Sequence, residues 1–194
     1  HPAYLDREHF GRREQHLPAD EIHALVLAQL RLLATVAREV NGARLHHVKP
    51  HGALYNQAAR DPHIADAIAH AVLEHDPQLL LVGLSGSALP AAGQALGLRV
   101  AHEVFAERRY QDDGSLTPRT QPDANIEDVE LAVQQVVRLL RDGQVLTHRG
   151  HLIDIAADSV CLHGDRADAV AFAQRLHAAI VSSGYLVSAI GAEL

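Results

Sequence analysis

One lysine and three histidines stand close together at the end of an expected strand. Lys49 is the only lysine among 17 basic residues, so a compact ammonium is used once in the whole chain. An ammonium beside imidazoles suits a phosphate or a developing oxyanion. His46 and His47 are adjacent and would point to opposite faces of a strand, so at most one of them shares a site with Lys49 and His51. We predict catalytic roles for Lys49 and His51; a solvated loop lysine and hydrogen-bonded histidines are the alternatives.

A hydrolytic metal site is a second interpretation of the histidines. His51, His163 and Asp165 carry nitrogen and oxygen ligands of the kind that such metals bind. The H-E-x-x-H spacing and the cysteine ligands of better-defined sites are absent from the sequence. No metal is therefore predicted, and a metal-dependent amidase or deacetylase is kept as the alternative enzyme.

Small residues follow the next expected strand, in the stretch GLSGS from Gly83 to Ser87. The G-x-S-x-G turn of serine hydrolases needs glycine where Ser87 stands, so this stretch does not support a serine nucleophile. Backbone N–H groups in such a turn can approach an anion at the start of the following helix. Ser85 and Ser87 are accordingly predicted to bind substrate, and a tight turn that only requires small residues is the alternative.

Charged residues gather at the end of the third expected strand. One of the two arginines, Arg108 or Arg109, is expected to clamp a substrate carboxylate through its bidentate guanidinium. A neighbouring glutamate, Glu103 or Glu107, would handle protons, and Glu103 is taken as the catalytic one. A surface cluster of salt bridges is the alternative.

The last expected strand leads directly into His163 and Asp165. His163 is predicted to bind substrate and Asp165 to act as a general base, although Asp165 serves equally well as the N-cap of the next helix. Cys161 within this strand is the only cysteine of the chain. A single cysteine excludes an internal disulfide and a thiolate-rich zinc site, and it favours a reducing, cytoplasmic location.

Strands and helices alternate along the chain. Apolar spacing and terminal Pro and Gly signals predict helices over residues 18–40, 64–73, 88–95, 126–140 and 168–183. Apolar runs predict strands over 45–48, 79–84, 98–105 and 159–162. This order favours an α/β fold with a parallel sheet, either open or closed into a barrel. Ligands bind at the carboxyl ends of such strands, so we expect the candidate residues to converge on one rim.

Composition excludes several other functions. A chain of 194 residues is long enough for one domain, and its formal net charge of -7 leaves no basic surface for nucleic acid. Four Tyr, three Phe and no Trp provide few platforms for stacking bases or sugars. No apolar run approaches the ~20 residues that span a bilayer, so no membrane association is expected.

Five stretches together resemble the LamB/YcsF family. They are His1-Pro2 with Phe10-Gly11-Arg12-Arg13, HHVKPHGALYNQ from His46, GLSGSAL from Gly83, EVFAERRYQDDGSLTPR from Glu103, and VCLHGD from Val160. They are long, ordered and spread over nearly the whole chain. Family members begin with an acidic first strand that this chain lacks, and a (β/α)₈ barrel typically has ~250 residues. Residues 1–194 are therefore expected to form a single (β/α)-barrel domain, N-terminally incomplete.

The resemblance implies a barrel of the glycoside hydrolase and deacetylase type and an ATP-dependent 5-oxoprolinase reaction. In that reaction 5-oxoproline (pyroglutamate), ATP with Mg²⁺, and water give L-glutamate, ADP and phosphate. The resemblance also implies partner subunits B and C, and it places Tyr55 and Asn56 in a substrate-binding stretch. A non-catalytic subunit that binds 5-oxoproline is the third interpretation, and assembly into a homo-oligomer is left open.

Overall fold

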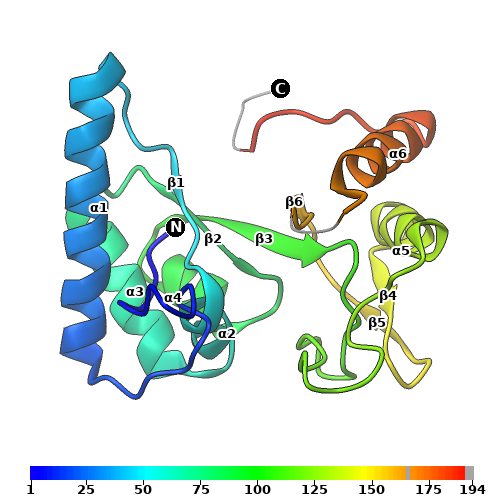
Figure 1. Ribbon diagram of the computed structural model, residues 1–194, viewed down its shortest axis with the longest axis horizontal. Helices are drawn as coiled ribbons and strands as arrows, with labels where there is room; N and C mark the ends of the chain where they lie inside the picture. The colour runs from blue at the N-terminus through cyan, green and yellow to red at the C-terminus, as the bar shows by residue number, and fades with distance from the viewer. Residues whose placement is uncertain (165–166, 191–194) are drawn as a thin grey trace. The chain divides into compact units, whose positions relative to one another are not determined.

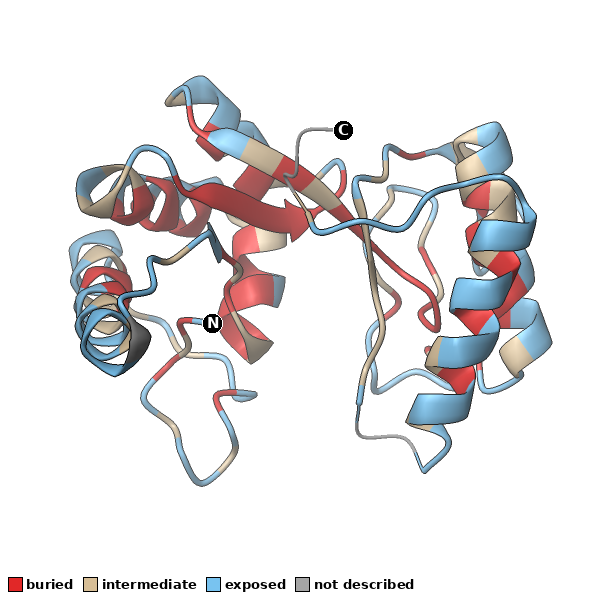
Figure 2. Cartoon of the chain, turned by 90° about the horizontal axis from the view of Figure 1, so that it is seen from above, coloured by how far each residue is buried: buried red, intermediate tan, exposed pale blue. Residues whose placement is uncertain are grey.

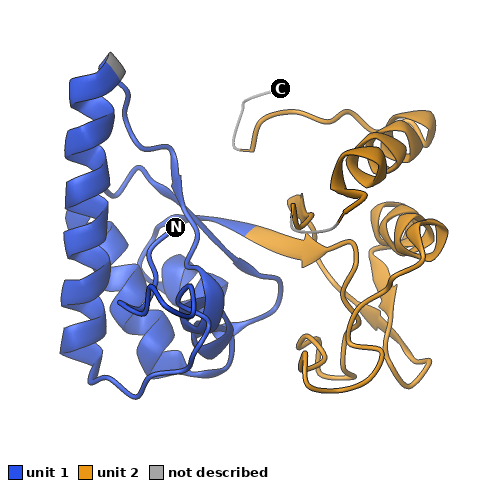
Figure 3. Cartoon of the chain, in the orientation of Figure 1, with its two compact units in different colours: residues 1–101 blue, residues 102–194 orange. Residues whose placement is uncertain are grey.

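The computed structural model describes residues 1–164 and 167–190. By its internal contacts the chain divides into two compact units, residues 1–101 and 102–194 (Figure 3). Both contain helices and strands, and Figure 2 shows buried residues in each of them.

The first unit contains two whole strands, the beginning of a third and four helices (Figure 1). In chain order its elements are α1 (Ala19–Asn41), β1 (His47–Val48), α2 (Gly52–Arg60), α3 (Pro62–His75), β2 (Leu80–Leu84) and α4 (Ala88–Ala95). β1 and β2 pair in parallel, with Val48 opposite Leu81. Helix α1 packs along α3, and their apolar faces meet in a core that includes Ile22, Val26 and Ile68.

Local signals explain where these helices begin and end. α1 starts after Pro18 and stops at Gly42, which takes the left-handed conformation with φ 70°. α3 starts at Pro62. The side chain of Asp61 caps this helix by accepting hydrogen bonds from the backbone N–H groups of His63 and Ile64. The sequence-based predictions of a helix over 18–40 and of another over 64–73 are confirmed.

The second unit is built from parallel strands, a hairpin and two packed helices. Its elements are the end of β3 (Arg99–Phe105), then α5 (Val129–Asp142), β4 (Gln144–Leu146), β5 (Leu152–Asp154), β6 (Ser159–Cys161) and α6 (Ala169–Ser182). β3 and β6 pair in parallel, with Glu103 opposite Ser159 and Phe105 opposite Cys161. α5 and α6 pack together around Val136 and Phe172.

Two elements differ from the sequence-based expectation. The chain after β1 is predicted to be a polar loop, whereas residues 52–60 form α2. Gly52 has φ 62° and no side chain caps this helix, so the usual start signals are missing. The hairpin of β4 and β5 is also unforeseen, because its three-residue strands are too short to show an alternating pattern.

The α/β class and the parallel pairing are confirmed. Closure of the strands into a barrel stays a prediction. No helix among the described residues is both long and apolar enough to cross a lipid bilayer.

Candidate functional site

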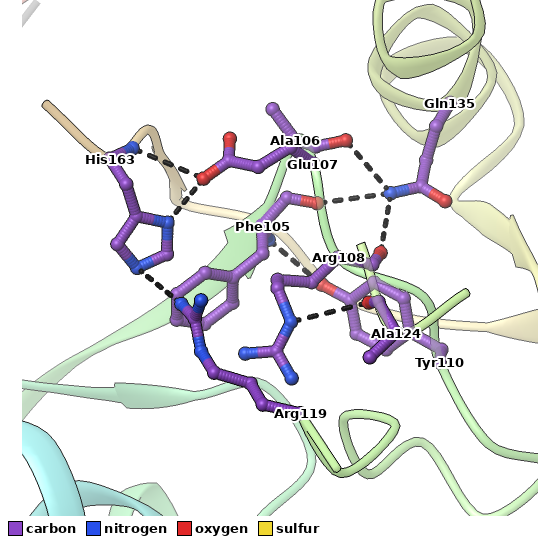
Figure 4. A network of polar contacts seen from close by, with 9 residues as sticks. All are labelled: Phe105, Ala106, Glu107, Arg108, Tyr110, Arg119, Ala124, Gln135 and His163. Atoms are coloured by element: carbon purple, nitrogen blue, oxygen red, sulfur yellow. Dashed lines mark hydrogen bonds and ion pairs between the residues drawn. The ribbon is translucent and has the colours of Figure 1, made fainter. Parts of the chain in front are cut away.

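A buried glutamate and a partly exposed histidine meet at the carboxyl ends of β3 and β6. Parallel pairing brings the residues that follow these two strands together. Nδ1 of His163 contacts Oε1 of Glu107, and the His163 backbone N–H donates to the same oxygen at 3.1 Å (Figure 4). The side chain of Glu107 is 5% exposed and that of His163 is 28% exposed. The carboxylate therefore lies inside the protein while the imidazole reaches the surface.

The imidazole ring of His163 is fixed in orientation by two contacts. A carboxylate at Nδ1 selects the tautomer that carries its proton there, which leaves the Nε2 lone pair on the outer edge of the ring. The ring also stacks on Phe105, with ring centroids 5.8 Å apart and an interplanar angle of 22°. An imidazole held this way can accept a proton at Nε2, and Glu107 would stabilise the imidazolium that forms.

Arg108 anchors the loop beside this pair from the inside. Its guanidinium donates from Nη2 to the carbonyl of Thr117 at 2.6 Å and from Nε to the carbonyl of Ala124 at 3.4 Å. Arg108 is 5% exposed, and burial lowers its pKa to about 10, with the positive charge of Arg119 adding to the shift. The charged fork of Arg108 is thus directed at backbone carbonyls of the loop.

Arg119 lies on the loop that Arg108 anchors. Its Nη2 atom is 3.4 Å from Nε2 of His163, as Figure 4 shows. The side chain is exposed, so this guanidinium stands at the surface next to the free edge of the imidazole.

A glutamine from α5 supports the turn after β3. Nε2 of Gln135 lies 3.0 Å from the carbonyl oxygens of Phe105 and Arg108 and 3.1 Å from that of Ala106. The hydroxyl oxygen of Tyr110 accepts the Phe105 N–H at 2.8 Å. Burial and then the charge of Glu103 raise the pKa of Tyr110, so its hydroxyl stays protonated. These bonds fix the backbone from which Glu107 projects.

Three residues of this site, Glu107, Arg119 and Gln135, are not among the site residues predicted from the sequence. Gln135 occupies the buried face of α5, between Val133 and Val136. A polar side chain on the apolar stripe of a helix is a readable signal for a buried hydrogen-bonding role. The sequence offers both Glu103 and Glu107 for proton transfer, and which of them meets His163 depends on the register of β3 against β6.

The first unit holds the lysine and the serines of the predicted site. The parallel pairing of β1 and β2 brings Lys49 and the turn after Leu84 to the same edge of this unit. Nζ of Lys49 lies 5.8 Å from the ring centroid of Tyr55. The hydroxyls of Ser85 and Ser87 are buried and have no hydrogen-bond partner within residues 1–164 and 167–190.

His51 has a structural contact in the same region. Its Nε2 lies 3.0 Å from the carbonyl oxygen of Phe10, so this nitrogen carries the proton and donates. Nδ1 is then the nitrogen available for the predicted proton transfer. Asn56, on α2, is exposed, whereas the neighbouring Tyr55 is buried.

The predicted residues fall into two groups. Lys49, His51 and the two serines lie in the first unit, while Glu103, Arg108, Arg109 and His163 lie in the second. Asp165 lies outside the described residues. Convergence of the two groups on one rim, and the roles assigned to their members, stay predictions. Within residues 1–164 and 167–190, no three His, Cys, Asp or Glu side chains form a cluster suited to a metal ion.

Known proteins resemble this chain over nearly its full length. The model of the LamB/YcsF family matches residues 1–193. The 5-oxoprolinase A subunit of Brevibacillus brevis is 49% identical over 189 residues, which cover 97% of this chain and 74% of that protein. The protein of the same name from Neisseria meningitidis serogroup A is 47% identical, with 97% and 77% covered. The crystal structure of a lactam utilization protein from Thermus thermophilus superposes with a TM-score of 0.86 at 40% identity, covering 95% of this chain and 73% of that one.

Proposed function

This chain belongs to the LamB/YcsF family, and from that premise we propose that it is the A subunit of an ATP-dependent 5-oxoprolinase. The reaction opens the lactam of 5-oxoproline to L-glutamate. The names of the relatives from Brevibacillus brevis and Neisseria meningitidis support this substrate and the existence of partner subunits, which we take to be B and C. Within the structure, the proposal depends on the pairing of Glu107 with His163.

Hydrolysis of a lactam needs a proton acceptor for water and a proton donor for the ring nitrogen. Water adds to the carbonyl carbon, and Nε2 of His163 takes its proton. The C–N bond then breaks, and the ring nitrogen leaves as the amine of glutamate with a proton from the imidazolium. Glu107 holds the ring and stabilises its charged form between the two transfers. When bound, ATP would supply a phosphoryl group to the carbonyl oxygen with release of ADP, and a second water would release that group as inorganic phosphate once the C–N bond has broken.

The turn between β2 and α4 fits a phosphate group. Ser85 and Ser87 each have a buried hydroxyl without a partner, and buried polar groups of this kind call for a ligand or water. Gly86 has φ 72°, and a Cβ there would meet nothing within 4 Å, so backbone N–H groups can be approached closely. Lys49 at the same edge would supply the positive charge. We propose that these residues hold the phosphates of Mg²⁺-bound ATP.

The fold also supports this function. Parallel strand pairs in both units, together with the TM-score of 0.86, support an arrangement shared with the lactam utilization protein. We propose that residues 1–194 belong to one (β/α)-barrel domain. We also propose a cytoplasmic location, which suits a chain whose one cysteine, Cys161, is in no disulfide among the described residues.

Reconstitution tests the proposed activity. The chain is mixed with its B and C subunits, and glutamate release from 5-oxoproline is measured with and without ATP. We expect release that needs ATP and falls at least a hundredfold in His163→Ala, within the usual ~10²–10⁴ range for acid–base catalysis. Release that continues without ATP and stops on treatment with a chelator would favour the metal-dependent amidase. Unchanged release in His163→Ala would leave the chain a non-catalytic binding subunit.

A further inference from the structure

The outer nitrogen of His163 faces a guanidinium. Glu107 engages Nδ1, so the lone pair of Nε2 is the one directed toward Arg119, whose Nη2 lies 3.4 Å away. Arg119 forms no ion pair with a carboxylate among the described residues. A guanidinium donating to Nε2 occupies the lone pair that a general base needs. In this arrangement the proposed base is therefore covered.

Arginine has a much better partner than a neutral imidazole. A carboxylate or a phosphate accepts two parallel N–H bonds from the guanidinium fork and carries a negative charge, whereas a neutral imidazole offers one lone pair and no charge. An oxyanion that reaches this surface would consequently draw Arg119 away from Nε2. The same event would supply a bound substrate and an uncovered base.

The loop around Arg119 is held at both ends and exposed between them. Arg108 bonds to the carbonyls of Thr117 and Ala124, and the Gln111 side chain donates to the Thr117 hydroxyl at 2.8 Å. Residues 118–123 between these anchors are exposed. A side chain on such a segment can exchange partners without moving the backbone that supports Glu107.

We propose that Arg119 is the oxyanion-recognition residue of this site and that anion binding uncovers Nε2 of His163. The oxyanion is the carboxylate of the lactam substrate or a phosphate group. This inference deepens the proposed function, on which it rests for the identity of the lactam. Arg119 thereby takes the clamp role that sequence reasoning expected of Arg108 or Arg109.

Ligand titrations followed by NMR test the inference without requiring turnover. The histidine ring resonances of the labelled chain are recorded with 5-oxoproline, with 2-pyrrolidinone, which lacks the carboxylate, and with inorganic phosphate. We expect the His163 signals to shift with at least one of the two anions and not with 2-pyrrolidinone. A response to 5-oxoproline alone assigns a carboxylate site, and a response to phosphate alone assigns a phosphate site. Absence of a response to either anion overturns the proposal.

Variants separate Arg119 from other surface arginines. Arg119→Gln should weaken the anion response about tenfold or more, as expected for loss of a charged hydrogen bond, and Arg119→Lys should retain part of it. Arg149→Gln is the matched control, because Arg149 is an exposed arginine of the same unit that faces Asp112 at 3.8 Å. An equal anion affinity in Arg119→Gln and the unaltered chain contradicts the proposal. If the anion response depends on Arg119 while the reconstituted complex releases no glutamate, the proposed function fails and the anion site stands.

Discussion

Gln135 on α5 and Arg108 after β3 are joined by a hydrogen bond of 3.0 Å from the glutamine Nε2 to the arginine carbonyl. The same amide also reaches the carbonyls of Phe105 and Ala106, so one side chain ties a helix to the turn that carries Glu107. The backbone that carries Glu107 therefore depends on a side chain 28 residues further along the chain.

Replacing Gln135 with leucine should destabilise the protein. The substitution removes the donor and leaves buried carbonyls unpaired, at a cost of about 1–3 kcal/mol in the free energy of unfolding. Urea denaturation measures the effect. Gln134→Leu is the matched control, because Gln134 is the adjacent glutamine on the exposed side of α5. Equal unfolding midpoints for the two variants would contradict the supporting role of Gln135.

Much of the fold follows from local sequence signals. Helices α1 (Ala19–Asn41) and α5 (Val129–Asp142) have regular apolar spacing and are capped by glycines with positive φ, so short-range physics defines them. The helix from Gly52 lacks these signals, since it begins with a glycine at φ 62° and no side-chain cap. Its formation depends on packing, which no local pattern records.

The sequence indicates where in the fold the candidate residues lie, but not which side chains contact one another. The rule that ligands gather where strands end draws attention to the residues after Phe105 and Cys161, which the structure brings together, and their role in binding stays a prediction. Which glutamate meets His163 depends on the parallel register of β3 and β6, and Glu103 lies within β3 opposite Ser159. The burial of Arg108 and the placement of Arg119 depend on how residues 111–125 fold back.

Gly52 should not tolerate a side chain. A Cβ at this position would lie 2.4 Å from the carbonyl oxygen of Gly11, and the backbone is left-handed with φ 62°. Gly42→Ala is the control, because Gly42 shares the positive φ of 70° but has open space around it. We expect Gly42→Ala to cost about 1 kcal/mol in unfolding free energy and Gly52→Ala clearly more. Equal thermal midpoints for the two variants would show that the contact with Gly11 relaxes freely.

Asp112 should contribute stability that is lost in acid. Hydrogen bonding from the Thr147 hydroxyl at 2.6 Å, and then from His151, lowers the pKa of Asp112 below its ordinary 3.8. A lowered folded-state pKa means that the unfolded chain binds the proton more readily. The stabilisation is therefore complete above pH 3.8 and declines as the pH falls through the lower, folded-state pKa.

Denaturant unfolding between pH 6 and pH 2.5 checks this dependence. Asp112→Asn should lose less stability over that range than the unaltered chain does. Asp123→Asn serves as the control, since Asp123 is an exposed aspartate of the same unit with φ 62°, a conformation that asparagine tolerates. If the free energy of unfolding falls equally with pH in the unaltered chain and in Asp112→Asn, the Thr147 contact contributes no stability.

Lys49 should be needed for turnover and not for folding. Under the proposed function its ammonium neutralises phosphate, a charge that the similarly shaped methionine lacks. Lys49→Met is therefore expected to reduce ATP-dependent glutamate release by about a hundredfold or more, in the range of a lost electrostatic contact in the transition state. Circular dichroism should be unchanged. Normal release by the variant would remove Lys49 from the mechanism.

Glu107 should act on the rate through His163. In Glu107→Gln the side chain keeps its shape but loses the charge that stabilises an imidazolium, so kcat should fall by about 10²–10⁴-fold while KM changes little. The readout is glutamate release by the reconstituted complex, together with the NMR signals of the His163 ring, which should report an altered tautomer. Glu130→Gln is the matched control, because Glu130 is an exposed glutamate of the same unit that pairs with Arg175 at 2.7 Å. A kcat for Glu107→Gln equal to that of Glu130→Gln would mean that the buried carboxylate only positions the loop and takes no part in proton transfer.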